Sequence, residues 1–452
     1  METFPNKSPK AKTGKRKILL YVFFTLIVVL LFFVVLEFLA RTARNAGLVN
    51  PERPDDRVAY ADNPFIKVTI KGVKYYESSS QWMVKSRFLV KKPRRLYRIF
   101  ILGESFAMGF PYVAQQAPND KGGMDSWIRA ELEVLGLAKR FEIINAAAGS
   151  QNSFSVKNYA KAACDSGADL IIIATGNNEG YSPSELNILL NKLTSYRLLK
   201  KAILREPDLF ERPTVPPKNE SLKIISSAFR KNLEEIILYA KEKKVAVALA
   251  TLPINLRGVV LVHSSALLSK EYLEGLRLRR EGSFQKAIDV FLKSPESGAK
   301  YFQIGKCLEG LGRFDDAFKA YMAAVTLDPA NRMLPTHNDM IKDMAKEYNL
   351  LLIDLESRIK SMAKNGIPGM EQFQDYCHMR WRYYAACADE ITSTLRSAGI
   401  IPHENVPWND FDEKLEMLLK QMKTNESYLR MFEHNPPIFF AEEDDYWVHN
   451  VQ

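Results

Sequence analysis

The sequence predicts an α/β fold in which a buried parallel sheet lies between two layers of helices. Three observations support this prediction. Five continuous apolar runs alternate with amphipathic stretches, as is typical of parallel strands that are buried on both faces. A helical segment between the last two of these strands repeats on itself. The first 40 residues contain an uninterrupted apolar run, which adds one predicted membrane-spanning helix before the α/β part.

Length and charge exclude several classes of protein. At 452 residues the chain is longer than a usual single domain, and its 46% hydrophobic and 26% charged residues exclude a disordered or collagen-like chain. The formal net charge is +10, but residues 1–17 hold six bases and one acid and so carry half of it. In the remaining chain both signs are interspersed, so we expect no nucleic-acid partner.

Residues 18–40 are predicted to form a membrane anchor. The 19 residues from Ile18 to Leu36 contain no charge and no proline, which at about 1.5 Å per residue suits a hydrocarbon core roughly 30 Å thick. The basic residues 1–17 predict a cytoplasmic tail, with the rest of the chain exported across the inner (cytoplasmic) membrane. A cleaved signal peptide has the same layout. The length of the run and the lack of a small-x-small site after Leu36 favour an uncleaved, single-pass anchor.

Residues 41–94 are predicted to form a spacer and a small hairpin that turns near Gly72. The α/β domain is expected in two parts, residues 95–262 and 336–402, followed by a C-terminal helix and tail over 403–452. The strands are expected at Leu96–Leu102, Phe141–Ala147, Leu170–Thr175, Val245–Leu252 and Leu350–Leu355. The helices between and after them are expected at Met124–Leu137, Val156–Ser166, Leu222–Lys243, Asp339–Tyr348 and Trp381–Ser397.

Residues 263–335 form a predicted helical insert that contains an internal repeat. Its second copy resembles a tetratricopeptide (TPR) repeat and ends in Asp328-Pro329, whereas the first copy is about four residues shorter. A coincidental helical hairpin is the alternative, which five matched positions disfavour. Two repeats seldom stand alone, so we expect the pair to pack against the host domain. Gly275, Gly282, Phe284, Ala287 and Phe291 recur 30 residues later as Gly305, Gly312, Phe314, Ala317 and Tyr321.

Polar residues follow three of the predicted strands, at the edge where open α/β sheets bind ligands. Ser105 comes after the first strand in Gly103-Glu104-Ser105, where it is either a helix N-cap or a reactive hydroxyl. A small polar loop that includes Gly149 follows the second strand. Asn177 and Asn178 follow the third, and side-chain amides at that position either bond the loop backbone or face a ligand.

Far downstream, Asp375 precedes His378 by three residues. This spacing can bring the carboxylate to Nδ1 of the ring and leave Nε2 free as a base, although a surface pair before the last helix has the same pattern. Cys377 is interpreted as a buried thiol rather than a nucleophile. The four cysteines match no disulfide or zinc spacing, and we expect no metal and no cofactor.

Together these segments resemble the SGNH (GDSL-type) hydrolase family over roughly residues 95–262 and 336–400. The resemblance implies a flavodoxin-like three-layer sheet and a serine esterase. Ser105 matches the nucleophile, His378 the base and Asp375 its orienting carboxylate. The oxyanion hole would combine the backbone N–H of Ser105, that of Gly149 and the side chain of Asn178. The chain departs from the family pattern at Glu104 and Glu179, where aspartate is usual.

With its anchor and TPR pair, the chain resembles a group of bacterial membrane-anchored SGNH/TPR proteins. The expected function is hydrolysis of an O-acetyl or acyl ester on an envelope glycan or lipid, in a periplasmic or extracellular domain. One alternative is acyl transfer to a sugar hydroxyl by the same residues. Another is a non-catalytic scaffold that recruits a protein partner through the TPR pair.

Overall fold

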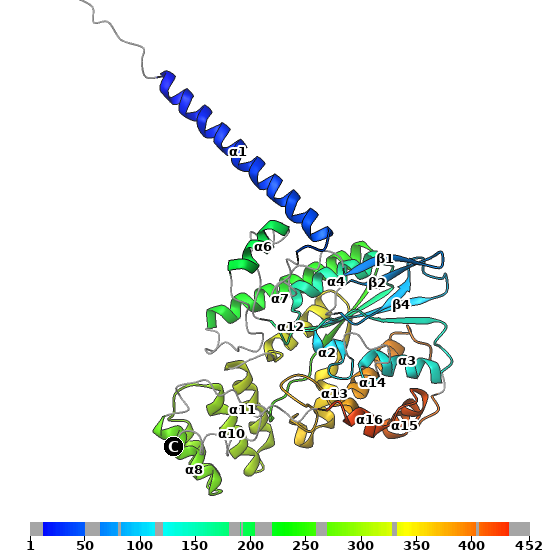
Figure 1. The fold of residues 1–452 in the computed structure, drawn as a ribbon. Helices are drawn as coiled ribbons and strands as arrows, with labels where there is room; N and C mark the ends of the chain where they lie inside the picture. Colours follow the sequence, from blue (N-terminus) through cyan, green and yellow to red (C-terminus); the bar gives the residue numbers. More distant parts are fainter. Residues whose placement is uncertain are drawn as a thin grey trace, which may run out of the picture. The chain divides into compact units, whose positions relative to one another are not determined.

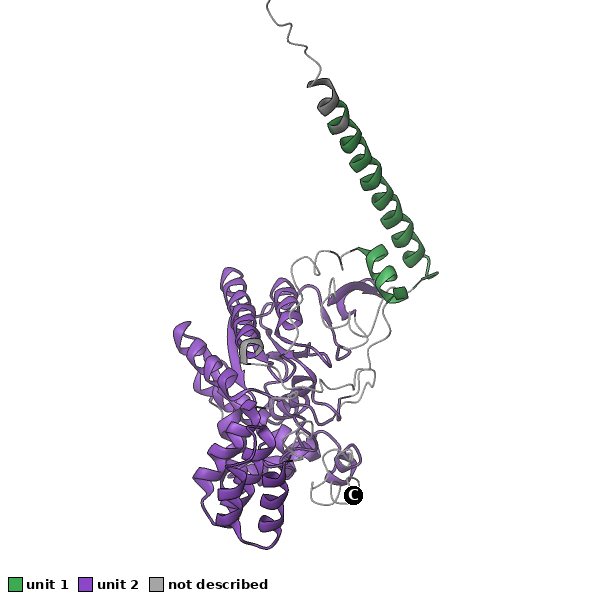
Figure 2. Cartoon of the chain, turned by 90° about the vertical axis from the view of Figure 1, so that its left-hand side faces the viewer, with its two compact units in different colours: residues 1–60, 183–211 green, residues 61–182, 212–452 purple. Residues whose placement is uncertain are grey.

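The computed structural model describes residues 12–49, 64–79, 83–113, 121–179, 190, 193–203, 219–258, 269–327, 332–403 and 406–433. The chain divides into two compact units, residues 1–60 with 183–211, and residues 61–182 with 212–452 (Figure 2). The predictions for residues 1–11, most of the spacer, Asp328-Pro329 and the C-terminal tail after residue 433 lie outside the described residues.

The first unit contains α1 (Lys12–Asn45) and α6 (Thr194–Ile203). In α1, the segment Leu19–Asn45 is long and apolar enough to span a membrane, with a mean hydropathy of 3.2 in its most apolar window. The helix extends past the predicted end at residue 40 because Arg41, Ala43 and Arg44 are good helix formers. The sequence did not predict α6, although it lies within the range 95–262 that was assigned to the α/β domain.

The second unit is built on a five-stranded parallel sheet with the order β5-β4-β6-β7-β8. In chain order this is 2-1-3-4-5, the order of flavodoxin-like folds, whose topological switch lies between the first and third strands. The prediction of a flavodoxin-like α/β sheet is therefore confirmed, and all five strands lie where the apolar runs place them. Their bounds are β4 (Tyr97–Gly103), β5 (Phe141–Asn145), β6 (Leu170–Ala174), β7 (Ala246–Thr251) and β8 (Leu351–Asp354).

Helices cover both faces of this sheet (Figure 1). One face packs against α4 (Ser153–Asp165), α7 (Asn219–Glu242) and α12 (Pro335–Glu347). The other packs against α3 (Met124–Val134), α13 (Leu355–Met362) and α14 (Trp381–Ser397). The central strands β4, β6 and β7 are therefore buried on both sides, as their sequences require, whereas the edge strand β8 is only partly buried.

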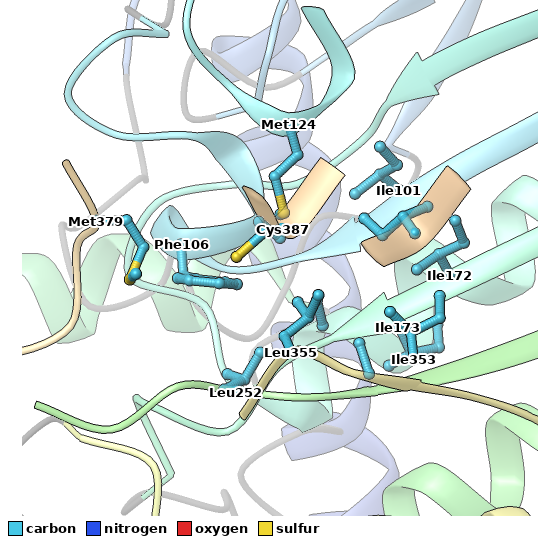
Figure 3. Packing of buried hydrophobic residues seen from close by; sticks show 14 of the residues in the cluster. Ile101, Phe106, Met124, Ile172, Ile173, Leu252, Ile353, Leu355, Met379 and Cys387 are labelled. Carbon is cyan, nitrogen blue, oxygen red and sulfur yellow. The ribbon is translucent and has the colours of Figure 1, made fainter. Parts of the chain in front are cut away.

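Buried side chains from strands and helices meet in one continuous core (Figure 3). Ile101, Ile172 and Ile353 come from three strands of the sheet, and Phe106 and Cys387 from helices. Each side chain of this kind that is removed from water stabilises the fold by roughly 1.5–3 kcal/mol. The core also holds the strand ends at fixed positions, and the loops that follow them carry the polar residues singled out above.

A separate three-stranded antiparallel sheet consists of β1 (Phe65–Ile70), β2 (Val73–Ser78) and β3 (Arg87–Leu89). The predicted hairpin is confirmed, with its turn at Lys71-Gly72. The sequence did not predict β3, which has only three residues. Arg98 of β4 is fully buried and donates to the carbonyl oxygen of Leu89, so a buried guanidinium joins the small sheet to the large one.

Four helices form two consecutive hairpins in the predicted insert: α8 (Lys270–Arg280), α9 (Phe284–Phe291), α10 (Gly298–Gly310) and α11 (Phe314–Leu327). A Cβ atom on Gly275 would lie 2.6 Å from the Phe291 ring, and one on Gly305 would lie 2.7 Å from the Tyr321 ring. The repeated glycines thus let each pair of helices approach. The insert packs on the rest of its unit through the ion pair of Arg257 with Glu309.

The C-terminal region forms α15 (Phe411–Gln421) and α16 (Glu426–Arg430). Lys414 of α15 is buried and forms an ion pair with the buried Glu131 of α3, at 2.6 Å, so this helix packs on the α/β domain. All four cysteines are buried free thiols.

Candidate active site

Ser105 lies at the switch point of the sheet, on the first residue of the short helix α2 (Ser105–Met108). The preceding strand β4 ends at Gly103, where a Cβ atom would lie only 2.0 Å from the carbonyl oxygen of Ala174. Only glycine therefore allows β4 to turn this close to β6. The turn leaves Ser105 partly exposed, whereas the next three residues are buried.

A chain of hydrogen bonds connects Ser105, His378 and Asp375. His378 Nε2 lies 2.8 Å from Ser105 Oγ, although the two residues are 273 positions apart in the sequence. On the other side of the ring, His378 Nδ1 lies 2.6 Å from Asp375 Oδ2. The structure thus brings together the three residues for which the resemblance implies a catalytic triad. The ring is oriented as a base requires, with one nitrogen on a carboxylate and the other on a hydroxyl.

The Asp375 carboxylate is also held by the backbone of its own loop. Its Oδ1 accepts hydrogen bonds from the N–H groups of Cys377, at 2.9 Å, and His378, at 2.7 Å. Burial by itself would raise the pKa of Asp375. The attraction of His378 and these hydrogen bonds outweigh burial and lower the pKa below its usual value. Asn255 fixes the same loop by donating to the Asp375 carbonyl oxygen at 2.7 Å.

Cys377 lies between the partly buried Tyr376 and the buried His378. Its side chain is buried, and burial raises the pKa of the thiol well above its usual value. The ligand atoms of Asp375, Cys377 and His378 nevertheless lie within 4.8 Å of one another, a proximity that sequence spacing did not indicate. Nδ1 and Oδ2 already bond to each other, and the raised thiol pKa opposes the thiolate that a metal would need. This set of donors suits a triad better than a metal site.

Gly149 and Asn178 lie on the loops that follow β5 and β6, the two strands beside β4. Both loops are therefore next to Ser105 in the sheet. Asn178 Nδ2 donates one hydrogen bond to the carbonyl oxygen of Gln151, at 2.9 Å, which ties the two loops together. The other N–H of this amide can serve a second acceptor.

Two glutamates connect these loops, the fully buried Glu104 and the partly buried Glu179. At both positions the chain departs from the pattern of the family that its sequence resembles. Glu104 accepts from the backbone N–H groups of Asn177, at 2.7 Å, and Asn178, at 3.2 Å. Glu179 accepts from the backbone N–H and the hydroxyl of Ser153, at the start of α4. The loop after β4 is thereby fastened to the loop after β6, and that loop in turn to the helix after β5.

Burial is the main influence on both carboxyl groups. It raises the pKa of Glu104 to about 8 and that of Glu179 to about 7, and the neighbouring Glu179 charge adds to the effect on Glu104. In the sequence, both residues stand out only as departures from the resembled pattern, with no role implied. A signal was present, since an acid directly beside a buried strand needs partners, but its partners come from other loops.

The arrangement can perform nucleophilic acyl chemistry. The Ser105 hydroxyl can donate its proton to Nε2 of His378 while Asp375 stabilises the resulting imidazolium. Backbone and side-chain N–H groups on three adjoining loops can supply donors for a developing oxyanion.

No family model and no curated protein matches the chain. Its sheet domain is similar in outline to several solved structures. One is an acetyl xylan esterase, AlAXEase, with 13% identity, a TM-score of 0.34, and coverage of 66% of this chain and 99% of that one. Another is a putative lipolytic protein of the G-D-S-L family from Desulfitobacterium hafniense, with 12% identity, a TM-score of 0.31, and coverage of 66% and 99%.

A third is a catalytic mutant of Axe2, an acetylxylan esterase from Geobacillus stearothermophilus, with 10% identity, a TM-score of 0.36, and coverage of 66% of this chain and 94% of that one. Because all three TM-scores are below 0.5, these similarities carry no functional argument, and any assignment of function rests on this chain's own residues.

Proposed function

We propose that this chain is a membrane-anchored serine esterase of the SGNH type, which hydrolyses an O-acetyl or acyl ester of an envelope glycan or lipid. The observation that carries the proposal is the hydrogen-bond chain from Asp375 through His378 to Ser105. The anchor α1 supports an envelope location, with the N-terminus in the cytoplasm and the α/β domain periplasmic or extracellular.

In the first half of the reaction, Ser105 Oγ attacks the ester carbonyl as its proton passes to Nε2 of His378. The tetrahedral oxyanion accepts hydrogen bonds from the N–H groups of Ser105 and Gly149 and from the side-chain amide of Asn178. His378 then gives the proton to the leaving alcohol, and an acyl-serine remains. In the second half, His378 activates a water molecule that releases the acid and restores Ser105.

The test is the hydrolysis of p-nitrophenyl acetate by the purified chain, together with labelling of Ser105 by a fluorophosphonate. We expect Ser105→Ala and His378→Ala to lower kcat by about 10⁴–10⁶-fold, because the triad acts as a unit. The matched control is Ser361→Ala. Ser361 is exposed on α13, and the fluorophosphonate should label it no more than background. Hydrolysis that persists in Ser105→Ala would remove the nucleophile from the proposal.

Acyl transfer is a variant of this function, because the same acyl-serine can be attacked by a sugar hydroxyl in place of water. The two outcomes are separated by adding an acceptor oligosaccharide and measuring acylated sugar against free acid.

The insert is proposed to be a TPR pair that binds a protein partner. The feature that favours this role is its exposed apolar side chains, since Leu273 of α8 and Leu292 after α9 are 53% and 55% exposed. A pull-down with the double variant Leu273→Glu/Leu292→Glu tests it. Loss of a partner with esterase activity intact supports recruitment, whereas altered substrate preference supports a role of the insert in guiding substrate.

A further inference from the structure

The helix α6 presents apolar side chains outward. Leu199 is 57% exposed and Ile203 is 69% exposed, whereas Thr194 and Arg197 on the opposite face are buried. A surface helix of a soluble domain has the reverse arrangement, with its apolar side turned to the core and its basic side to water. The pattern of α6 fits an environment that is less polar than water.

The N-terminus of α6 is fastened to α1 through the carboxylate of Glu37. Glu37 accepts hydrogen bonds from the backbone N–H groups of Thr194 and Ser195, both at 2.9 Å, and from the Ser195 hydroxyl at 2.7 Å. It also forms an ion pair with Arg41 at 2.6 Å. A carboxylate at the N-terminus of a helix satisfies the free N–H groups there and complements the helix dipole. Figure 2 draws α6 beside the C-terminal end of α1, in the same unit.

The position of Glu37 along α1 fixes the depth of this contact in a bilayer. Glu37 directly follows the 19-residue apolar run that ends at Leu36. That run is about 28 Å long as a helix, which matches the hydrocarbon core and puts Glu37 at the boundary with the headgroups. A charged group near that boundary needs partners, and the start of α6 supplies them. The start of α6 is therefore at the boundary as well.

We propose that α6 is an interfacial membrane helix, which lies on the leaflet where α1 emerges and inserts Leu199 and Ile203 among the upper parts of the acyl chains. Lys200 and Lys201 are then at the level of the lipid phosphates, which suits their charge. This inference rests on the proposed anchoring by α1 and goes beyond it, because it assigns a second membrane contact about 160 residues further along the chain.

The test uses the full chain reconstituted in phosphatidylcholine and phosphatidylglycerol vesicles. An environment-sensitive fluorophore is placed on Leu199→Cys or, separately, Ile203→Cys, and vesicles with and without a lipid carrying a nitroxide near the headgroup are compared. We expect a blue-shifted emission at both positions and loss of fluorescence with the nitroxide lipid. Leu273→Cys and Leu292→Cys, which have similar exposure on the insert, should show neither effect.

A label at Leu30→Cys, read in vesicles whose nitroxide is carried deep on the acyl chain, reports on α1 itself, because Leu30 lies about 9 Å below the boundary at Leu36. Hydrolysis of p-nitrophenyl acetate confirms that each variant is folded. Quenching at Leu30, Leu199 and Ile203 but not at Leu273 supports the proposal. Quenching at Leu30 alone overturns it and leaves the anchor intact. No quenching at Leu30 overturns the anchoring and the α6 proposal together. Cross-linking of two chains through Ile203→Cys without quenching shows that a second copy covers α6, and this too overturns the proposal.

Discussion

Glu104 offers the sharpest test of how the site is positioned. Its side chain is fully buried, and its two oxygens accept from the N–H groups of Asn177 and Asn178, at 2.7 and 3.2 Å. The substitution Glu104→Gln keeps one acceptor oxygen and replaces the other by an NH₂ group. The amide oxygen can retain the shorter bond to Asn177, while the NH₂ group then faces the N–H of Asn178, which loses its acceptor.

The magnitude follows from that one broken bond. A buried N–H group left without an acceptor costs about 1–3 kcal/mol. If all of this free energy is expressed as displacement of the Asn178 side chain, kcat falls by about 5- to 150-fold. The upper limit is set by Asn178→Ala, because removing one oxyanion donor costs about 10²–10³-fold. KM should change little, since no role in substrate binding is assigned to Glu104.

The assay is a double-mutant cycle on p-nitrophenyl acetate hydrolysis. If Glu104 acts through Asn178, the double variant Glu104→Gln/Asn178→Ala should lose no more activity than Asn178→Ala alone. Glu131→Gln is the matched control, because Glu131 is equally buried but bonds Lys414 and Thr392 and touches no loop of the site. It should lower stability without lowering kcat. Additive losses in the cycle would refute the reasoning.

Three further outcomes follow from buried groups. The free energy of unfolding should fall by a few kcal/mol as pH rises from about 4.5 through 8. The pKa values of Glu104 and Glu179 are raised to about 8 and about 7, so over this range the folded state holds protons that the unfolded state has released. Urea titrations across the range measure the change, and a stability that rises toward pH 8 would contradict it. Arg98→Leu should lower the free energy of unfolding by about 3–5 kcal/mol, because it leaves Glu142 without its ion-pair partner. Chemical unfolding measures this loss, and a loss below about 1 kcal/mol would show that the guanidinium is dispensable. Gly305→Ala should lower the stability of the insert by about 1–3 kcal/mol, because the new Cβ would lie 2.7 Å from the Tyr321 ring. The expected result is faster proteolysis of the insert with an unchanged kcat.

Periodicity predicted the sheet well because its central strands β4, β6 and β7 are almost entirely buried. The run Leu170–Thr175 has no polar residue before its last position, so its burial and its place in a parallel sheet follow from composition alone. The edge strand β3 has three residues and only one buried side chain, too little for a periodic signal. The helix α6 was missed although its sequence is amphipathic, with Leu199 and Ile203 on one side and Thr194 and Arg197 on the other.

The candidate site was predictable where its chemistry is local and unpredictable where it is not. The three-residue spacing from Asp375 to His378 is sufficient to join their side chains within one loop. The bond from His378 to Ser105 could be expected only by resemblance, because no local pattern joins residues so far apart. The contacts of Glu104 and Glu179 depend on how three loops meet at the end of the sheet, and that geometry has no counterpart in linear spacing.

The distance along the chain between Ser105 and His378 has a consequence for biosynthesis. The hydroxyl and the ring that hydrogen-bonds it are 273 residues apart, with the helical insert between them. At the usual rate of about 5–20 residues per second, the ribosome makes the second partner some 14–55 s after the first. The serine therefore has no base while the N-terminal half emerges. If Ser105 is the nucleophile, as proposed, it can react only after the strand β8 and the loop beyond it complete the sheet, so we expect a truncated or unfinished chain to show no esterase activity.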